Sequence, residues 1–281
     1  MPNTDYPAMP GPIGVFDSGY GGLTILEGIR QMLPEYDYVY LGDNARAPYG
    51  SRSFEVVYQF TRQALLRLFQ MGCHLVVLGC NTASAKALRT LQQHDLPEVD
   101  PSRRVLGIIR PTAEAIGAIT KSRHVGILAT EGTVRSRSYE LEIRKLFPDI
   151  TVTGQACPLW AAIVEAGEGN TDGADYFVGK RIRQLLDRDP AIDSIILGCT
   201  HYPLLMQSIE RHTPAGVHVV AQGEYVAASL KDYLSRHEEI ASKITRGGTC
   251  QYFTTESPER FNESARIFLR ETISARHVSL D

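Results

Sequence analysis

Two short segments combine a thiol with polar neighbours directly after an apolar run. Residues 195–204 read Ile-Ile-Leu-Gly-Cys-Thr-His-Tyr-Pro-Leu, with the thiol at Cys199. Residues 76–83 read Val-Val-Leu-Gly-Cys-Asn-Thr-Ala, with the thiol at Cys80. A short apolar run of this kind predicts a buried parallel strand, and open α/β sheets bind ligands at the carboxyl ends of such strands. Each segment therefore predicts a cysteine at the ligand-binding edge of a sheet.

The position of these cysteines suggests what their sulfur atoms do. A cysteine between a strand and a helix lies among unpaired backbone N–H groups, near the positive end of the helix dipole. We expect this setting to lower the thiol pKa from about 8.5 into a range of about 3.5 to 7.5, so that the thiolate acts as a nucleophile or a base. One such cysteine favours covalent catalysis. Two of them, one from each half of the chain, suggest thiols that face each other across a cleft.

Facing thiols suit the inversion of a carbon acid. One thiolate removes a proton from one face of the carbon while the opposite thiol supplies a proton to the other face. With each sulfur about 3–3.5 Å from the carbon, the two sulfurs would lie about 6–7 Å apart. A disulfide is excluded at that separation, because its S–S bond is about 2.04 Å long. The other cysteines, Cys73, Cys157 and Cys250, are interpreted as small buried apolar residues.

Two alternatives for the cysteines are weaker. His201, two residues after Cys199, could indicate a metal site, but no further ligand spacing supports zinc and we predict no metal. A redox protein is disfavoured because the chain has no Cys-x-x-Cys pair. Its five cysteines, an odd number, indicate a reducing compartment rather than a disulfide framework.

Composition excludes several classes of protein. The chain has 281 residues, of which 43% are hydrophobic and 22% charged, as in an ordinary globular protein. Its net charge of −3 gives no reason to expect nucleic acid as a partner. Residues 1–12 lack the apolar core of a signal peptide, and no apolar run approaches the roughly 18–20 residues that span a bilayer. We expect a cytoplasmic protein that does not bind a membrane.

The surrounding pattern alternates strands and helices, which predicts parallel sheets with helices on both faces. We predict an α/β fold of two pseudo-symmetric doubly wound domains with mostly parallel sheets and the active site in the cleft between them. The first domain comprises 13–104 and 217–281, the second comprises 105–216, and 1–12 form a short extension. The expected strands lie at 13–16, 37–41, 76–79, 125–129, 150–153, 194–197, 217–220 and 250–254, and residues 105–109 begin the second series. Later helices are expected at 204–211, 225–234 and 258–270.

Similar segments in the two halves indicate an internal duplication. Residues 14–16 (Gly-Val-Phe) resemble residues 126–128 (Gly-Ile-Leu). Residues 29–34 (Ile-Arg-Gln-Met-Leu-Pro) resemble residues 143–148 (Ile-Arg-Lys-Leu-Phe-Pro). The number of residues between corresponding segments of the two halves increases slowly along the chain, up to the two cysteines. Two related folds with small differences in their loops would give this result.

Asp17 and Ser18 follow the strand at 13–16 and precede a glycine-rich turn. Such a turn lets backbone N–H groups approach an anion, although the dinucleotide fingerprint would need glycine where the chain has Thr24. Helix capping by either side chain is an equally good interpretation of the Asp17-Ser18 pair.

Together these motifs resemble the aspartate/glutamate racemase family, and glutamate racemases in particular, from about Ile13 to the end of the chain. The two cysteine motifs are specific in combination and less so alone. The resemblance rests on residues 14–19 and 21–23, 42–46 and 48–50, 80–84, 131–134, 157–159 and 164–165, 197–205, and 252–255 with 258–261.

This resemblance implies a cofactor-independent racemase, without pyridoxal phosphate, that interconverts L- and D-glutamate for peptidoglycan precursors. It implies that Cys80 works on the D-glutamate face with help from Asp17, and Cys199 on the L-glutamate face with help from His201 and Glu165. The pattern alone would make Glu165 a solvated helix residue. The implied substrate-binding residues are Asp17, Ser18, Pro48, Tyr49, Gly50, Asn81, Thr82, Thr200 and His201. We expect glutamate as the small-molecule partner and a homodimer.

Some positions depart from the family pattern, and alternatives remain open. Residues 160–162 (Trp-Ala-Ala) stand where Phe-Val-Pro is usual, residues 221–222 (Ala-Gln) where Asp-Ser is usual, and Arg110 where an acidic residue is common. The short extension does not lead us to predict activation by a precursor. A racemase acting on aspartate and an additional role as an inhibitor of DNA gyrase remain alternatives. A related decarboxylase would need only one cysteine.

Overall fold

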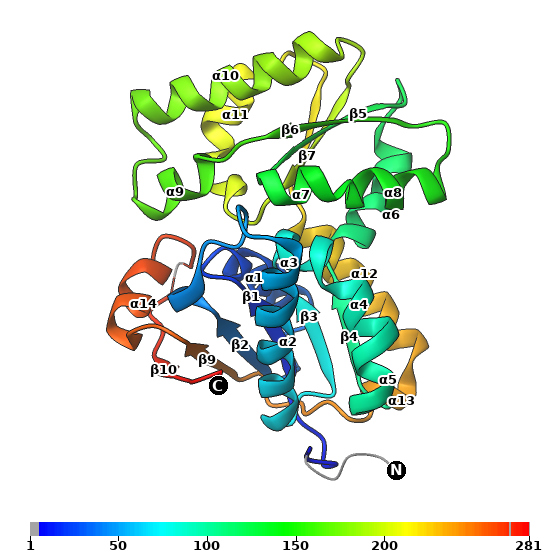
Figure 1. Ribbon diagram of the computed structural model, residues 1–281, viewed down its shortest axis with the longest axis vertical. Coiled ribbons are helices and arrows are strands. Elements are labelled where there is room, and N and C mark those ends of the chain that lie inside the picture. Colours follow the sequence, from blue (N-terminus) through cyan, green and yellow to red (C-terminus); the bar gives the residue numbers. More distant parts are fainter. Residues whose placement is uncertain (1–5, 270, 281) are drawn as a thin grey trace.

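The computed structural model describes residues 6–269 and 271–280, so residues 1–5 of the expected extension and residue 270 of the last expected helix lie outside the described part. Two parallel sheets organise the chain, as predicted (Figure 1). The first has the strand order β10-β9-β2-β1-β3-β4 and the second the order β6-β5-β7-β8. The first sheet consists of β1 (Ile13–Asp17), β2 (Tyr38–Gly42), β3 (Leu75–Leu78), β4 (Arg104–Gly107), β9 (Cys250–Thr254) and β10 (Ala275–His277). The second consists of β5 (His124–Ala129), β6 (Thr151–Ala156), β7 (Ser194–Gly198) and β8 (His218–Val220).

The strand orders support the internal duplication. The order β2-β1-β3-β4 at one end of the first sheet repeats as β6-β5-β7-β8 in the second, so that β3 corresponds to β7. Every residue of β1, β2, β3 and β7 is buried, which explains why these strands appear as continuous apolar runs rather than as alternating patterns.

Two strands lie in a different sheet from the one expected. β4 pairs with β3 in the first sheet, although 105–216 was assigned to the second domain. β8 pairs with β7 in the second sheet, although 217–281 was assigned to the first domain. In both cases the strand extends the sheet of the strand before it, and the chain changes sheet only afterwards. The exact domain boundaries therefore remain a proposal, with these two strands reassigned. β10 was not predicted.

Helices connect the parallel strands. The helices before β5 are α1 (Gly22–Met32), α2 (Phe54–Gln70), α3 (Asn81–Lys86), α4 (Leu88–Thr90), α5 (Leu96–Val99) and α6 (Ile109–Ile119), with a 3-10 turn η1 (Asn44–Arg46) and a π-helical turn η2 (Leu91–Asp95). Between β5 and β8 lie α7 (Glu131–Ser136), α8 (Ser138–Leu146), α9 (Trp160–Glu165), α10 (Asp172–Arg188), the 3-10 turn η3 (Tyr202–Leu205) and α11 (Met206–His212). The last helices are α12 (Gly223–Arg236), α13 (Glu238–Ala241) and α14 (Pro258–Ala265).

Local sequence explains where several helices begin. Ser53 accepts a hydrogen bond from the N–H of Val56 at the start of α2, and Thr171 accepts one from Ala174 at the start of α10. Such side chains satisfy N–H groups that the first turn leaves unpaired. The buried residues of α2, which include Val57, Leu65 and Leu68, recur with the period of an α-helix.

The hydrophobic core is continuous between the two sheets. One buried cluster contains Leu23 and Leu26 of α1, Leu230 of α12, Leu197 of β7 and Trp160 of α9. Figure 1 shows α12 returning from the second sheet to lie beside the helices of the first. The two halves are thus joined by packing as well as by the chain. Among the described residues, no helix combines the length and apolar character needed to cross a membrane.

Candidate active site

Cys80 and Cys199 occupy equivalent places in the two halves. Cys80 follows β3 and is the N-cap residue of α3, where its sulfur accepts a hydrogen bond from the N–H of Ala83 over 3.5 Å. Cys199 follows β7 and precedes the turn η3. Their exposed fractions are only 5% and 6%. The prediction of one cysteine at the carboxyl edge of each sheet is therefore confirmed.

The expected lowering of the thiol pKa is wrong for Cys80. Burial, reinforced by the negative charge of Asp17, raises the pKa of Cys80 to about 12, and hydrogen bonds from Ser18 and Ala83 offset only part of this. The cost of removing a thiolate from water outweighs the favourable position at the start of α3. Cys80 is consequently a protonated thiol at neutral pH.

Ser18 and Asp17 surround Cys80. The Ser18 hydroxyl lies 3.4 Å from Cys80 Sγ. Asp17 is 1% exposed, and its Oδ2 accepts a hydrogen bond from the N–H of Gly19 over 2.9 Å. Burial raises the pKa of Asp17, while the charge of His201 acts in the opposite direction. The strand end of β1 thus brings a hydroxyl to the sulfur of Cys80 and a buried carboxyl into electrostatic contact with it.

Cys199 has a different set of partners. His201 Nδ1 lies 3.7 Å from Cys199 Sγ, and His201 Nε2 lies 2.7 Å from Glu165 Oε1. Burial alone would lower the pKa of His201, but its hydrogen bonds and charge interactions with Cys199 and Glu165 raise it to about 10. At neutral pH His201 is therefore an imidazolium, whose positive charge stabilises negative charge on Cys199 Sγ. Glu165 is an exposed residue of α9, as the sequence pattern predicts, yet its carboxylate contacts His201.

The glycine-rich turn after Asp17 is needed for close packing between the two halves. A Cβ added at Gly21 would lie 2.3 Å from Thr200 Oγ1 and 2.5 Å from His201 Nδ1. The backbone O of Thr200 also accepts a hydrogen bond from Thr24 Oγ1 over 3.1 Å. This turn therefore brings Thr200 and His201 of the second half against α1 of the first, a purpose that the anion-binding interpretation did not include.

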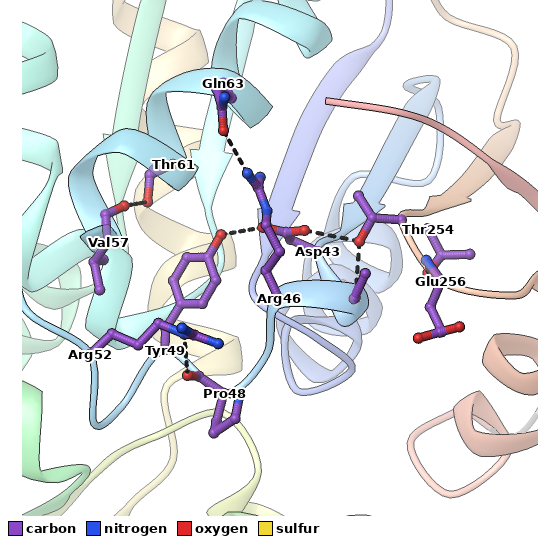
Figure 2. A network of polar contacts seen from close by, with 12 residues as sticks. Asp43, Arg46, Pro48, Tyr49, Arg52, Val57, Thr61, Gln63, Thr254 and Glu256 are labelled. Atoms are coloured by element: carbon purple, nitrogen blue, oxygen red, sulfur yellow. Dashed lines mark hydrogen bonds and ion pairs between the residues drawn. The ribbon is translucent and has the colours of Figure 1, made fainter. Parts of the chain in front are cut away.

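The loop at 48–50 is anchored by a network of polar contacts around a fully buried carboxyl (Figure 2). The hydroxyl of Tyr49 donates to Asp43 Oδ2, which also accepts from Arg46 Nε over 2.7 Å. The backbone O of Gly50 accepts from the N–H of Gly132 over 2.8 Å, which ties this loop to the second half. Pro48 is exposed.

Asn81 and Thr82 lie in the first turn of α3 and contact the second half. Thr82 Oγ1 is 3.0 Å from the hydroxyl of Thr130, the N-cap residue of α7. Tyr139 donates a hydrogen bond to Asn81 Oδ1 over 2.6 Å, and Asn81 Nδ2 donates to Gln222 Oε1 over 2.6 Å. The sequence assigned no function to Thr130, Tyr139 or Gln222. They lie in segments far from the cysteine motifs, and only their polar character at buried positions could have indicated a role.

Two of the three remaining cysteines are buried, as expected for small apolar residues. Cys73 and Cys157 are buried, whereas Cys250 is half-buried. Among the described residues, no three His, Cys, Asp or Glu side chains are grouped so that they could hold a metal ion.

A cavity of about 560 Å³ lies beside Cys199, between α1, β7, β8 and the start of α12. Of the predicted site residues it touches only Cys199 and Thr200.

Several known proteins are similar to this chain in sequence and structure. The Asp/Glu/Hydantoin racemase family matches residues 14–230. The glutamate racemase of Dinoroseobacter shibae is 40% identical over 276 residues, which cover 95% of this chain and 98% of the relative. The glutamate racemase of Ruegeria sp. (strain TM1040) is 39% identical over 273 residues, covering 93% and 98%.

Solved structures give the same result. The glutamate racemase isoform RacE1 of Bacillus anthracis has a TM-score of 0.87 at 35% identity and covers 96% of this chain and 98% of its own. The glutamate racemase of Francisella tularensis, solved with D-glutamate, has a TM-score of 0.86 at 29% identity, with coverages of 97% and 98%. The family match includes both cysteine-bearing strand ends, and the two curated relatives cover 93% and 95% of the chain. The chain therefore belongs to the Asp/Glu/hydantoin racemase family.

Proposed function

We propose that the protein is a glutamate racemase that interconverts L- and D-glutamate by exchanging the α-proton between two thiols. The observation that carries this proposal is the equivalent placement of Cys80 and Cys199 at the carboxyl ends of corresponding strands, β3 and β7, in two similarly ordered sheets. The curated relatives of nearly the same length are named glutamate racemases. The likeness to an aspartate racemase of Picrophilus torridus, at 16% identity, concerns the fold alone.

The proposed reaction needs the two sulfurs in different starting states. Cys80, with a pKa of about 12, begins as the thiol. The reaction of L-glutamate then requires Cys199, whose Sγ lies 3.7 Å from His201 Nδ1, to begin as the thiolate. For L-glutamate, Cys199 Sγ takes the α-proton. The electron pair of the broken C–H bond stays on the α-carbon. Cys80 Sγ–H then gives its proton to the opposite face, which yields D-glutamate, a Cys199 thiol and a Cys80 thiolate.

The other proposed residues serve these two steps. Asp17 and Ser18 adjust the proton affinity of Cys80, and Glu165 maintains the charge of His201. Hydroxyl, amide and backbone groups would bind the two carboxylates and the ammonium group and stabilise the charge that develops as the α-proton leaves. The proposed substrate-binding residues are Asp17, Ser18, Pro48, Tyr49, Gly50, Asn81, Thr82, Thr200 and His201. No step requires a cofactor.

The decisive experiment follows L-glutamate in deuterated water by optical rotation and by α-deuterium content. We expect rotation to disappear while deuterium enters mainly the product enantiomer early in the reaction. Cys80→Ala and Cys199→Ala should each abolish racemisation without unfolding the protein. Racemisation near the parent rate in either variant would refute the two-thiol mechanism. Faster turnover of L-aspartate than of L-glutamate would favour the aspartate alternative.

We further propose that the protein supplies D-glutamate for peptidoglycan, acts in the cytoplasm and forms a homodimer. The first two follow from the proposed reaction and from the buried, unpaired thiols. Depletion of the protein in its own host should then create a requirement for D-glutamate, which growth with and without that amino acid tests. Sedimentation at several protein concentrations tests the dimer, and a single species at the mass of one chain, 31.1 kDa, would exclude it.

A further inference from the structure

A closed ring of hydrogen bonds joins Asn81, Tyr139 and Gln222. Asn81 Nδ2 donates to Gln222 Oε1 over 2.6 Å. Gln222 Nε2 donates to the Tyr139 hydroxyl oxygen over 2.8 Å, and this hydroxyl donates to Asn81 Oδ1 over 2.6 Å. Each side chain donates once within the ring and accepts once.

Contacts outside the ring determine its direction. Gln222 Nε2 has two hydrogens, so beside the one given to Tyr139 only one remains for the backbone O of Ile108 at 3.0 Å and Thr112 Oγ1 at 3.1 Å, which must share it. A backbone carbonyl only accepts hydrogen bonds, so the amide nitrogen of Gln222 must face it rather than the amide oxygen. Once Gln222 is oriented in this way, the only consistent arrangement has the Asn81 nitrogen towards Gln222 and the Asn81 oxygen towards Tyr139.

The ring lies where the two halves of the molecule meet. Asn81 follows Cys80 in α3, Tyr139 belongs to α8, and Gln222 lies between β8 and α12, where the chain returns to the first sheet. A Cβ added at Gly198 would lie 3.1 Å from Tyr139 Cε2, so the tyrosine packs against the strand end that carries Cys199. All three ring members are 3% exposed. Buried polar groups are costly unless they are paired, so each member depends on the other two.

We propose that Gln222 and Tyr139 are positioning residues that hold the side-chain amide of Asn81 in one orientation at the substrate site. This inference rests on the proposed function, in which Asn81 binds substrate. The ring uses one N–H and one lone pair of the Asn81 amide, which leaves its second N–H and second lone pair pointing in fixed directions. Gln222, one of the positions that depart from the family pattern, thus has a structural role in this ring.

A double-mutant cycle tests the proposal. Gln222→Met and Tyr139→Phe keep the size of each side chain and remove its ring contacts, and we expect each to lower kcat/KM for L-glutamate about 10- to 100-fold, because a small misplacement of a positioned group costs up to about 100-fold. In an Asn81→Ala background the same changes should have less than about a 2-fold further effect, since the group they orient is absent. Equal losses in both backgrounds would show a purely structural role and overturn the proposal.

A matched control and a second measurement complete the test. Thr112→Val removes a Gln222 contact outside the ring and should change kcat/KM by less than about 2-fold. In NMR spectra of the parent, one side-chain amide proton of Asn81 should exchange at least about tenfold more slowly than in Gln222→Met or Tyr139→Phe. Equal exchange in all three proteins would also overturn the proposal. If the parent does not racemise glutamate, the proposed function fails, whereas the exchange rates still decide whether the ring orients Asn81.

Discussion

Replacing Glu165 by Gln should shift the pH dependence of catalysis through His201 without altering the cysteines. The carboxylate of Glu165 lies 2.7 Å from His201 Nε2 and is one of the groups that raise the pKa of this histidine to about 10. A glutamine keeps a hydrogen-bond acceptor at the same position and removes only the charge. The imidazolium beside Cys199 should therefore lose its proton at a lower pH than in the parent protein.

The size of the shift follows from the exposure of the pair. A hydrogen bond to a charged group contributes about 1.5–3 kcal/mol when it is well shielded. The side chain of Glu165 is 38% exposed and that of His201 is 9% exposed, so water screens the pair from one side and we reduce this contribution to about 1–1.5 kcal/mol. Since one pKa unit corresponds to about 1.36 kcal/mol, the pKa of His201 should fall by about one unit, to roughly 9.

Two measurements test this prediction. The high-pH limb of kcat/KM for L-glutamate should move from near pH 10 in the parent to about pH 9 in Glu165→Gln, and an NMR titration of His201 should show the same displacement. Glu168→Gln makes the same chemical change at an exposed position three residues away and should leave both curves in place. If the high-pH limb of kcat/KM does not move in Glu165→Gln, or if it moves equally in Glu168→Gln, Glu165 does not raise the pKa of His201.

Three further substitutions give distinct outcomes. Because burial raises the pKa of Asp17, its proton binding favours the folded state at low pH, and this stabilisation disappears as the pH rises through its folded-state pKa. Asp17→Asn should therefore slow racemisation yet stabilise the fold at neutral pH, and a gain of about 1 kcal/mol would raise Tm by about 2–4 °C. Gly21→Ala would place its Cβ 2.3 Å from Thr200 Oγ1 and should cost about 1–3 kcal/mol of stability and up to about 100-fold in kcat/KM. Tyr49→Phe removes a donor to the buried Asp43, so calorimetry should show a loss of about 1–2 kcal/mol, together with a raised KM.

Controls separate these effects from general damage to the fold. Gly173→Ala adds a methyl group in the first turn of α10, where its Cβ would lie 3.7 Å from Thr171 Oγ1, and it should be neutral in both assays. Phe60→Leu removes a ring whose centroid lies 5.8 Å from that of Tyr49. It leaves the hydrogen bond from Tyr49 to Asp43 in place, so KM should stay unchanged. A Tm for Asp17→Asn below that of the parent at pH 7 would contradict the burial argument.

The strands and the cysteines could be predicted because they depend on local sequence. A run such as that of β3 must be buried on both faces, and the glycine and cysteine that follow mark where it ends. The duplication was visible for the same reason, since similar apolar runs recur along the chain. The sheet to which β4 and β8 belong could not be read in this way, because both sheets accept an apolar edge strand and only tertiary packing decides between them.

The pKa of Cys80 shows a different limit of sequence analysis. Its position after a strand and before a helix was predicted correctly, but the sign of the pKa shift depends on burial and on Asp17, which lies on another strand. The ring around Gln222 is a stronger example, since its contact with Asn81 spans 141 residues of sequence. Polar residues at such separations carry no local signal, because nothing in their immediate sequence distinguishes a buried partner from a solvated one.

The internal duplication explains why the two halves offer similar frames but different chemistry. Equivalent strands deliver Cys80 and Cys199 at equivalent points, which follows from the repeated strand order. The side chains added around each sulfur then diverge: a hydroxyl and a carboxyl beside Cys80, an imidazolium beside Cys199. A reaction that takes a proton from one face and returns one to the other needs two sulfurs in opposite protonation states at the same moment. In the proposed mechanism, burial with Asp17 at Cys80 and the positive charge of His201 at Cys199 distinguish two thiols that identical surroundings would leave equivalent.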